Sequence, residues 1–103
     1  MSRFLMQPNG KLAVFSEIVD NFTHANLDQE DALRVARADM DLGPESARHK
    51  VNRGLARGLD AEGGWKECLE TVRVIHGEKI CAEVVQEILN AENERPRPRK
   101  RRV

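Results

Sequence analysis

The strongest pattern in this sequence is a helical repeat of apolar residues near its C-terminal end. Between residues 80 and 89, six medium or large apolar side chains recur at steps of three and four, the spacing of one helix face. A second repeat runs from Trp65 to Ile75, and Gly77 between the two is typical of a helix C-cap. We therefore expect two helices that form a C-terminal helical hairpin.

The apolar stripe of the last helix allows two interpretations. It is either the centre of the core or half of a homodimer interface, because a stripe of this size needs an apolar partner surface. The dimer interface would consist of Ile80, Cys81, Val84, Val85 and Ile88. The sequence alone leaves both interpretations open.

The N-terminal end has the pattern of a β-hairpin. Apolar runs at residues 4–6 and 12–15 flank the segment Gln7-Pro8-Asn9-Gly10, whose proline, asparagine and glycine suit successive positions of a turn. Two strands alone are only marginally stable in water, so we expect helices to cover one face of the hairpin.

The segment that follows the hairpin is expected to form a short helix. Ser16 is a suitable N-cap for it. Ile18, Val19 and Phe22 would share one side of this helix, which would end near residues 24–26.

The middle of the chain predicts two helices joined by a short turn. Asp28 is a suitable N-cap, and Asp31 lies in the first turn, where the helix dipole favours a carboxylate. Residues 41–44 end this helix, and Pro44 fits the first turn of the next one, which runs to about residue 57. The expected buried stripes are Ala32, Leu33, Ala36 and Met40 in the first helix and Ala47, Val51 and Leu55 in the second.

The second of these helices has the composition of a DNA-recognition helix. In a helix-turn-helix unit the second helix enters the major groove and needs an apolar back and a basic front. No acidic residue interrupts residues 48–58, and Gly54 on the apolar side either permits a close approach or only adds flexibility. Arginine and lysine contact guanine or phosphate, and asparagine recognises adenine. The candidate nucleic-acid-binding residues are His49, Lys50, Asn52, Arg53 and Arg57.

Charge is segregated along the chain although the formal net charge is zero. The net charge is −4 over residues 1–47, +4 over residues 48–58, −6 over residues 59–94 and +6 over residues 95–103. Two basic segments on an acidic body create local potentials that the total conceals.

Residues 95–103 are expected to form a disordered basic arm outside a single compact domain of residues 1–94. The arm has two prolines and one apolar residue, so it cannot continue a helix or bury a core. It suits contacts with nucleic-acid phosphates, a nuclear import signal, or association with the acidic body. Its candidate nucleic-acid contacts are Arg95, Arg97, Arg99, Lys100, Arg101 and Arg102.

The acidic residues argue against a duplex-binding protein. Without the arm, residues 1–94 carry a net charge of −6. Asp39, Asp41 and Glu45 lie at the predicted turn, where they would repel phosphate or instead pair with the basic helix. An acidic body could also mimic nucleic acid and occupy the basic groove of a partner.

No residue pattern predicts an enzyme, a metal site or a cofactor. Cys68 and Cys81 lie on apolar stripes and are expected to be reduced core residues, because their spacing with His76 is irregular for a zinc site. No apolar run is long enough to span a membrane, and the N-terminal residues lack the apolar core of a signal peptide. We therefore expect a cytoplasmic protein without enzymatic activity.

These patterns predict a mainly α (α+β) fold, with an N-terminal β-hairpin, about four helices that include a helix-turn-helix-like unit and a C-terminal helical hairpin, and a basic tail. The predicted function is that of a small DNA-binding regulatory protein that uses its basic helix and tail. The alternative is a protein–protein interaction module, such as an inhibitor, adaptor or accessory subunit, that acts through acidic surfaces or a helical stripe. Added salt should weaken DNA binding, whereas an apolar interface should persist.

Overall fold

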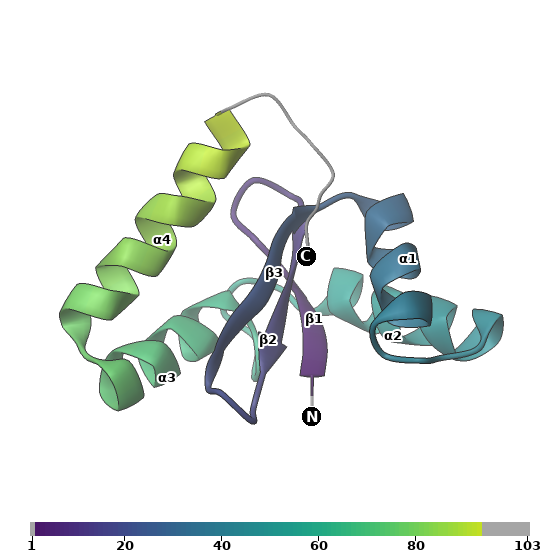
Figure 1. Cartoon of the computed structure of the whole chain (residues 1–103), viewed down its shortest axis with the longest axis horizontal. Coiled ribbons are helices and arrows are strands. Elements are labelled where there is room, and N and C mark those ends of the chain that lie inside the picture. The colour runs from purple at the N-terminus through teal and green to yellow at the C-terminus, as the bar shows by residue number, and fades with distance from the viewer. Residues whose placement is uncertain (1, 94–103) are drawn as a thin grey trace.

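The computed structural model describes residues 2–93 of the chain, with side chains up to residue 88. An antiparallel sheet with the strand order β1-β2-β3 is followed by four helices in these residues. The elements are β1 (Ser2–Met6), β2 (Leu12–Ser16), β3 (Asn21–Leu27), α1 (Gln29–Ala38), α2 (Pro44–Ala56), α3 (Trp65–His76) and α4 (Glu78–Asn93). Figure 1 shows α1 and α2 on one side of the sheet and α3 and α4 on the other. The fold is therefore a mixed α+β arrangement in three layers, mainly helical as predicted.

The predicted N-terminal hairpin is confirmed. Strand β1 pairs with β2 in antiparallel register, with Phe4 opposite Val14. The Gly10 N–H donates to the Gln7 carbonyl (3.0 Å), and the Gln7 N–H donates to the Lys11 carbonyl (2.8 Å). Gly10 has a φ of +86°, a left-handed conformation that glycine adopts without strain.

The helix predicted after Ser16 is wrong, because residues 21–27 form a third strand instead. Ser16 ends β2, and its hydroxyl accepts a hydrogen bond from the Ile18 N–H (3.2 Å) in the turn that follows. Asp20 in this turn has a φ of +53°. Phe22 then packs edge-on against Phe15, with ring centroids 5.4 Å apart. Pairing with β2 and burial of this aromatic ring outweigh the weak helical pattern.

Strand β3 lacks the simple alternation that identifies a strand in a sequence. Its register with β2 shifts twice, between Leu12 and Val14 and between Val14 and Phe15. Each shift turns the residues that follow toward the other face, so the period of two is lost. Asn26 of β3 has a φ of +58°, and its side-chain amide donates to the Ile88 carbonyl of α4 (2.9 Å). The irregular strand is thus attached to the last helix.

The central strand β2 divides the core into two clusters, because successive residues of a strand point to opposite faces. The cluster on the side of α1 and α2 consists of Phe4, Leu12, Val14, Ala32, Ala36, Ala47 and Val51. The cluster on the side of α3 and α4 consists of Leu5, Phe15, Trp65, Cys68, Val72 and Ile88.

Helix α1 begins where the sequence predicts it. The Asp28 carboxylate accepts a hydrogen bond from the Asp31 N–H (2.7 Å), which satisfies one of the free donors of the first turn. The expected stripe is also confirmed, because Ala32 and Ala36 are fully buried and Leu33 and Met40 pack against the first cluster.

Helix α2 packs closely on β1 through small residues. It begins at the predicted Pro44, and its buried residues are Ala47, Val51 and Gly54. A Cβ atom on Gly54 would lie only 2.4 Å from the Cβ atom of Phe4 and 2.9 Å from its carbonyl carbon. Close approach to β1 therefore requires glycine at this position.

Leu55 and Ile75, which the apolar spacing placed on the stripes of α2 and α3, are exposed. The exposed fraction is 36% for Leu55 and 56% for Ile75. The buried stripe of α2 runs through residues 47, 51 and 54, and that of α3 runs through residues 65, 68 and 72. Because each residue turns a helix by about 100°, Leu55 and Ile75 lie to one side of these stripes.

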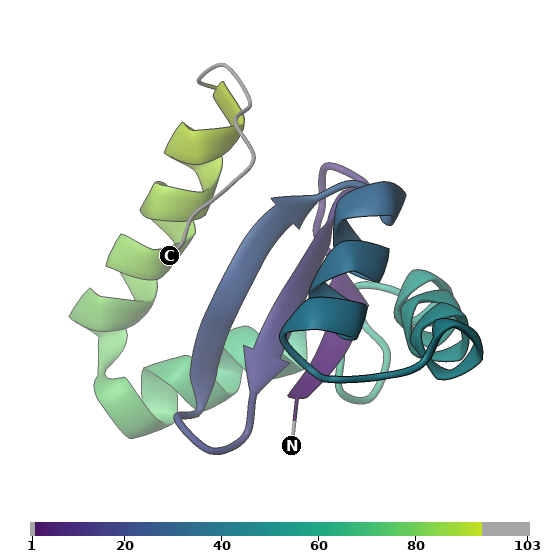
Figure 2. The same cartoon turned by 45° about the vertical axis from the view of Figure 1, so that its right-hand side comes forward.

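Helices α3 and α4 are joined through Gly77 alone, which has a φ of +99°. This confirms the predicted helical hairpin. Figures 1 and 2 show that α4 runs back from the joint at an angle to α3. In α4, Ile88 is buried and Cys81 and Val84 pack against the second cluster, whereas Ile80 is 38% exposed. Most of the described stripe therefore contributes to the core.

Candidate nucleic-acid interface

The predicted nucleic-acid-binding residues of α2 lie away from the face that packs on β1. The burial of Ala47, Val51 and Gly54 turns the long polar side chains of the helix outward. His49, Asn52 and Arg53 are exposed, as is Arg48, whereas Lys50 and Arg57 are half-buried. The tail residues 95–103 lie outside the described part of the chain.

The cations of α2 are divided between two flanks of the helix. At about 100° per residue, Lys50, Arg53 and Arg57 fall on one flank and Arg48 falls on the opposite flank. His49 lies between the flanks and points away from the sheet. The helix therefore has cations on both sides of a polar outer surface.

None of the α2 cations forms an ion pair with a described residue. Other described cations do form ion pairs, in which Arg3 pairs with Glu17, Arg34 with Asp31, Lys66 with Asp60, and Arg73 with Glu70 and Glu78. Apart from Arg57 at the C-cap of α2, the described arginines and lysines outside α2 that lack an ion pair are Lys11, Arg37 and Lys79, one each from three separate parts of the chain. Among the described residues, positive charge without an ion pair is therefore concentrated on α2 and its C-cap Arg57.

The acidic residues at the turn before α2 do not neutralise this charge. The Asp39 carboxylate is 3.0 Å from Nε2 of His24 on β3. Asp41 and Glu45 are exposed and form no ion pair with the described residues. Of the two effects weighed for these acids, pairing with the basic helix is therefore not observed. Glu45 keeps a negative charge beside the outer surface of α2.

Arg57 differs from the other cations of α2 because it is tied to the sheet. Its guanidinium donates a hydrogen bond from Nη1 to the Phe4 carbonyl (2.7 Å), which lies on β1. Partial burial and the charges of Arg3 and Arg53 lower the pKa of Arg57. Arg57 has a structural role at the end of α2, and its contact with nucleic acid stays a prediction.

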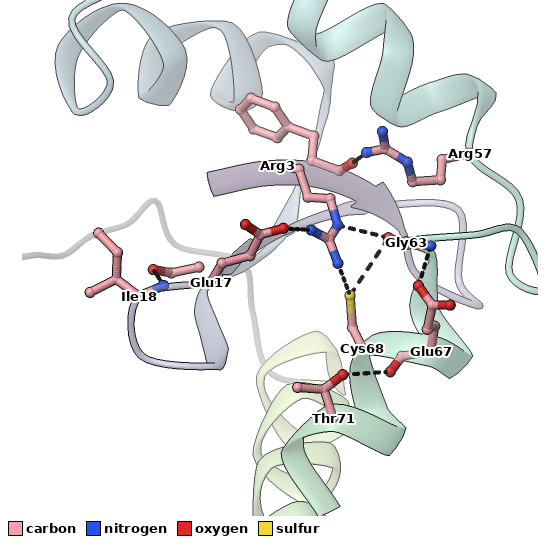
Figure 3. Close-up of polar contacts among 10 residues, drawn as sticks. Arg3, Glu17, Ile18, Arg57, Gly63, Glu67, Cys68 and Thr71 are labelled. Atoms are coloured by element: carbon pink, nitrogen blue, oxygen red, sulfur yellow. Dashed lines mark hydrogen bonds and ion pairs between the residues drawn. The ribbon is translucent and has the colours of Figure 1, made fainter. Parts of the chain in front are cut away.

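A cluster around Arg3 was not predicted from the sequence (Figure 3). The Arg3 guanidinium donates from Nε to the Gly63 carbonyl (3.0 Å) and from Nη2 to Sγ of Cys68 (3.5 Å), and it lies over the Phe15 ring at 5.3 Å. These partners are distant in the sequence, so no local pattern could reveal them. Arg3 fastens the loop between α2 and α3 to the edge strand β1.

Gly63 allows two arginines to approach this loop together. It has a φ of +77°, and a Cβ atom there would lie 3.2 Å from Nε of Arg3 and 3.6 Å from Nε of Arg57. The basic flank of α2 therefore continues past Arg57 to Arg3. Glu17 pairs with Arg3, so the positive charge at the Arg3 end of this basic flank is neutralised. The charges of Lys50 and Arg53 on the same flank are not neutralised by a described residue.

Both cysteines are free thiols, as predicted. Cys68 is fully buried, and burial raises the pKa of its thiol despite the nearby Arg3 guanidinium. The Cys81 thiol donates to the Leu69 carbonyl (3.5 Å). Within the described residues, no group of three or more His, Cys, Asp or Glu side chains is placed to hold a metal ion.

Comparisons with known proteins give no relative for this chain. No protein-family model, no curated protein and no solved structure matches it. Any functional inference therefore depends on the geometry of the molecule itself.

Among the described residues, no helix has both the length and the apolar composition needed to cross a membrane.

Proposed function

We propose that this protein binds the phosphate backbone of duplex nucleic acid through α2, with the basic tail adding affinity. The proposal rests on one observation: α2 concentrates exposed cations that have no partner within the described residues. Elsewhere on the same molecule, exposed cations such as Arg34 and Arg73 are neutralised by carboxylates. Free cations on a rigid helix favour an external anion.

The arrangement of α2 suits a groove. Arg48 on one flank and Lys50 and Arg53 on the other would contact phosphates on the two sides of the groove, which positions the helix without reading sequence. His49 and Asn52 on the outer surface would then face the base edges, where asparagine recognises adenine. Glu45 would lie close to the backbone and weaken binding, so we expect modest affinity from α2 alone.

The experiment is a salt titration of binding to a labelled duplex, measured by fluorescence anisotropy with the full chain. We expect Arg48→Gln/Arg53→Gln to weaken binding at low salt by about a hundredfold or more, since each of the two charge-assisted hydrogen bonds contributes about 1.5 kcal/mol or more and about 1.4 kcal/mol corresponds to tenfold. The slope of log affinity against log salt should become shallower by about 1.8, because each phosphate contact on B-DNA contributes about 0.9.

The matched control is Lys66→Gln/Arg73→Gln, which removes the same charge from α3 on the other side of the sheet. We expect this variant to bind nearly as well as the natural chain, because both cations are already paired with carboxylates. Equal weakening by the two double variants would show that only net charge matters. Absence of binding at low salt would exclude the proposal.

A protein-binding role is the second candidate, and a different observation favours it. Ile18, Val74 and Ile75 expose more than half of their surface and lie outside α2. Monomeric proteins seldom leave several large apolar side chains exposed together unless they bind a partner. Binding through these residues should persist at salt concentrations that abolish binding through α2.

A further inference from the structure

Exposed apolar side chains gather where the turn between β2 and β3 meets the joint between α3 and α4. The exposed residues are Ile18 (83%) and Val19 (50%) in the turn, and Val74 (69%), Ile75 (56%) and Ile80 (38%) beside the joint. Nε2 of His76 lies 3.0 Å from the Val19 carbonyl, which holds the turn against the end of α3. Figures 1 and 2 both show the two segments side by side. We call these five residues the apolar corner.

The apolar corner is distinct from the rest of the described surface. Of the six exposed large apolar side chains among the described residues, five belong to the corner and the sixth is Leu55 on α2. Figure 3 shows Ile18 pointing away from the Arg3 cluster, so that cluster does not cover it. Because removing apolar surface from water is favourable, covering several of these side chains together would favour association.

The charges next to the apolar corner indicate what covers it. Glu17 is paired with Arg3, and Arg73 is paired with Glu70 and Glu78. Asp20, next to Val19, and Lys79, next to Ile80, have no ion pair with a described residue. Asp20 and Lys79 have opposite signs and come from the turn half and the helix half of the corner, and the exposed Glu83, one turn further along α4, also has no ion pair with a described residue.

We propose that the apolar corner is a homodimer interface in which Asp20 of each copy pairs with Lys79 of the second copy. In a twofold dimer the same surface meets itself, so a turn half with a free negative charge and a helix half with a free positive charge are complementary. The formal net charge of zero adds no overall repulsion between copies. The interface differs from a dimer through the stripe of α4, because Cys81, Val84 and Ile88 serve the core and Ile80 remains available.

The dimer would be weak and would leave α2 free. A standard interface buries about 800 Å² and 20–30 residues on each partner, which is more than five partly exposed side chains and their charged neighbours supply. We therefore expect a dissociation constant on the order of micromolar. Figures 1 and 2 place the joint between α3 and α4 on the opposite side of the sheet from α2, and the turn between β2 and β3 at the end of the strands, so we expect self-association and nucleic-acid binding to be separate properties.

The test is sedimentation velocity of the full chain from about 1 μM to about 1 mM, the range in which weak dimers form. A concentration-dependent shift from monomer to dimer is expected. Ile18→Ser/Ile75→Ser should weaken association by about tenfold or more, because it removes two apolar side chains from the centre of the interface. The matched control is Leu55→Ser, which changes an exposed leucine outside the corner and should leave association unchanged. Circular dichroism will confirm that each variant is folded.

The charge pairing is tested by a double-mutant cycle with Asp20→Asn and Lys79→Gln. Asparagine tolerates the left-handed backbone of residue 20 (φ +53°), so the first variant changes charge with little strain. Each single variant should weaken the dimer, and the second substitution should cost nothing once the first is present. A monomer at all concentrations, or a dimer that survives Ile18→Ser/Ile75→Ser, would overturn the proposed interface. Additive effects of the two charge variants would overturn the pairing.

Discussion

The two faces of the sheet are packed in different ways. On one face, α1 and α2 approach the strands through small residues, and Gly54 lies against the backbone of β1. On the other face, aromatic rings fill the space, with the Trp65 ring centroid 5.4 Å from that of Phe22. The first arrangement leaves Arg48 and Arg53 of α2 exposed to solvent. The second builds its centre from larger side chains, including Phe15 and Trp65, and exposed apolar residues lie at its margin.

Removing the aromatic centre of the α3 and α4 side should cause the largest loss of folding stability. Trp65 is 7% exposed and packs on Phe22, so Trp65→Ala leaves a cavity and should lower the free energy of unfolding by about 3–5 kcal/mol. Urea denaturation followed by far-UV circular dichroism measures this change, because the substitution removes the single tryptophan. Leu55→Ala, which truncates an exposed side chain, is the control. A loss below 1 kcal/mol for Trp65→Ala would contradict this account of the face.

On the α1 and α2 side, adding side-chain volume should destabilise the fold. Gly54→Val places side-chain atoms where the backbone of Phe4 lies, and should lower the free energy of unfolding by about 2–3 kcal/mol despite the better helix propensity of valine. Gly58→Ala is the matched control, because no atom lies within 4 Å of the added Cβ there. The two variants are compared in urea denaturation. Equal stabilities would show that α2 does not approach β1 closely.

Arg57 at the end of α2 should contribute mainly to stability, whereas Arg53 should contribute mainly to duplex binding. Arg57→Met removes the hydrogen bond to the Phe4 carbonyl and should lower the free energy of unfolding by about 1–2 kcal/mol. Arg53→Met makes the same change at an exposed residue without such a bond, and should affect duplex binding more than stability. Thermal unfolding and anisotropy titrations of both variants test this difference. If Arg57→Met leaves the free energy of unfolding unchanged, the hydrogen bond from Arg57 to β1 does not contribute to stability.

The smallest expected effect is a pH dependence on the α3 and α4 side. Burial raises the pKa of Cys68, so the folded thiol keeps its proton at pH values where the unfolded thiol loses it. The folded state then binds more protons, and the free energy of unfolding should decrease as pH rises above about 8.5. Cys68→Ala should remove the part of this decrease that begins near the ordinary thiol pKa of about 8.5, whereas Cys81→Ala should retain it. The chain has no tyrosine to complicate this range.

Two patterns confined to a few neighbouring residues were predicted correctly, whereas the equally local helix pattern after Ser16 was wrong. The hairpin turn at Gly10 and the N-cap at Asp28 depend on residues within four positions of each other, and both occur where expected. Strand β3 was missed because its two register shifts remove the alternation, and only pairing with β2 defines it. For the candidate interface, helical spacing placed the polar residues of α2 away from the buried residues 47, 51 and 54, but it did not show that Arg48 lies on the flank opposite Lys50 and Arg53.

The sequence by itself determined the order of the hairpin and the four helices, the basic character of α2 and the segregation of charge, because these follow from spacing and composition. The tertiary structure decided which charges are neutralised and which apolar residues are covered. Arg3 finds its partners at Glu17, Gly63 and Cys68 only after the chain has folded, whereas Arg48 and Arg53 find none among the described residues. Ile75 belongs to an apolar repeat but is left exposed because α3 packs through Trp65, Cys68 and Val72. Pairing and burial depend on contacts between distant residues, which no local pattern specifies.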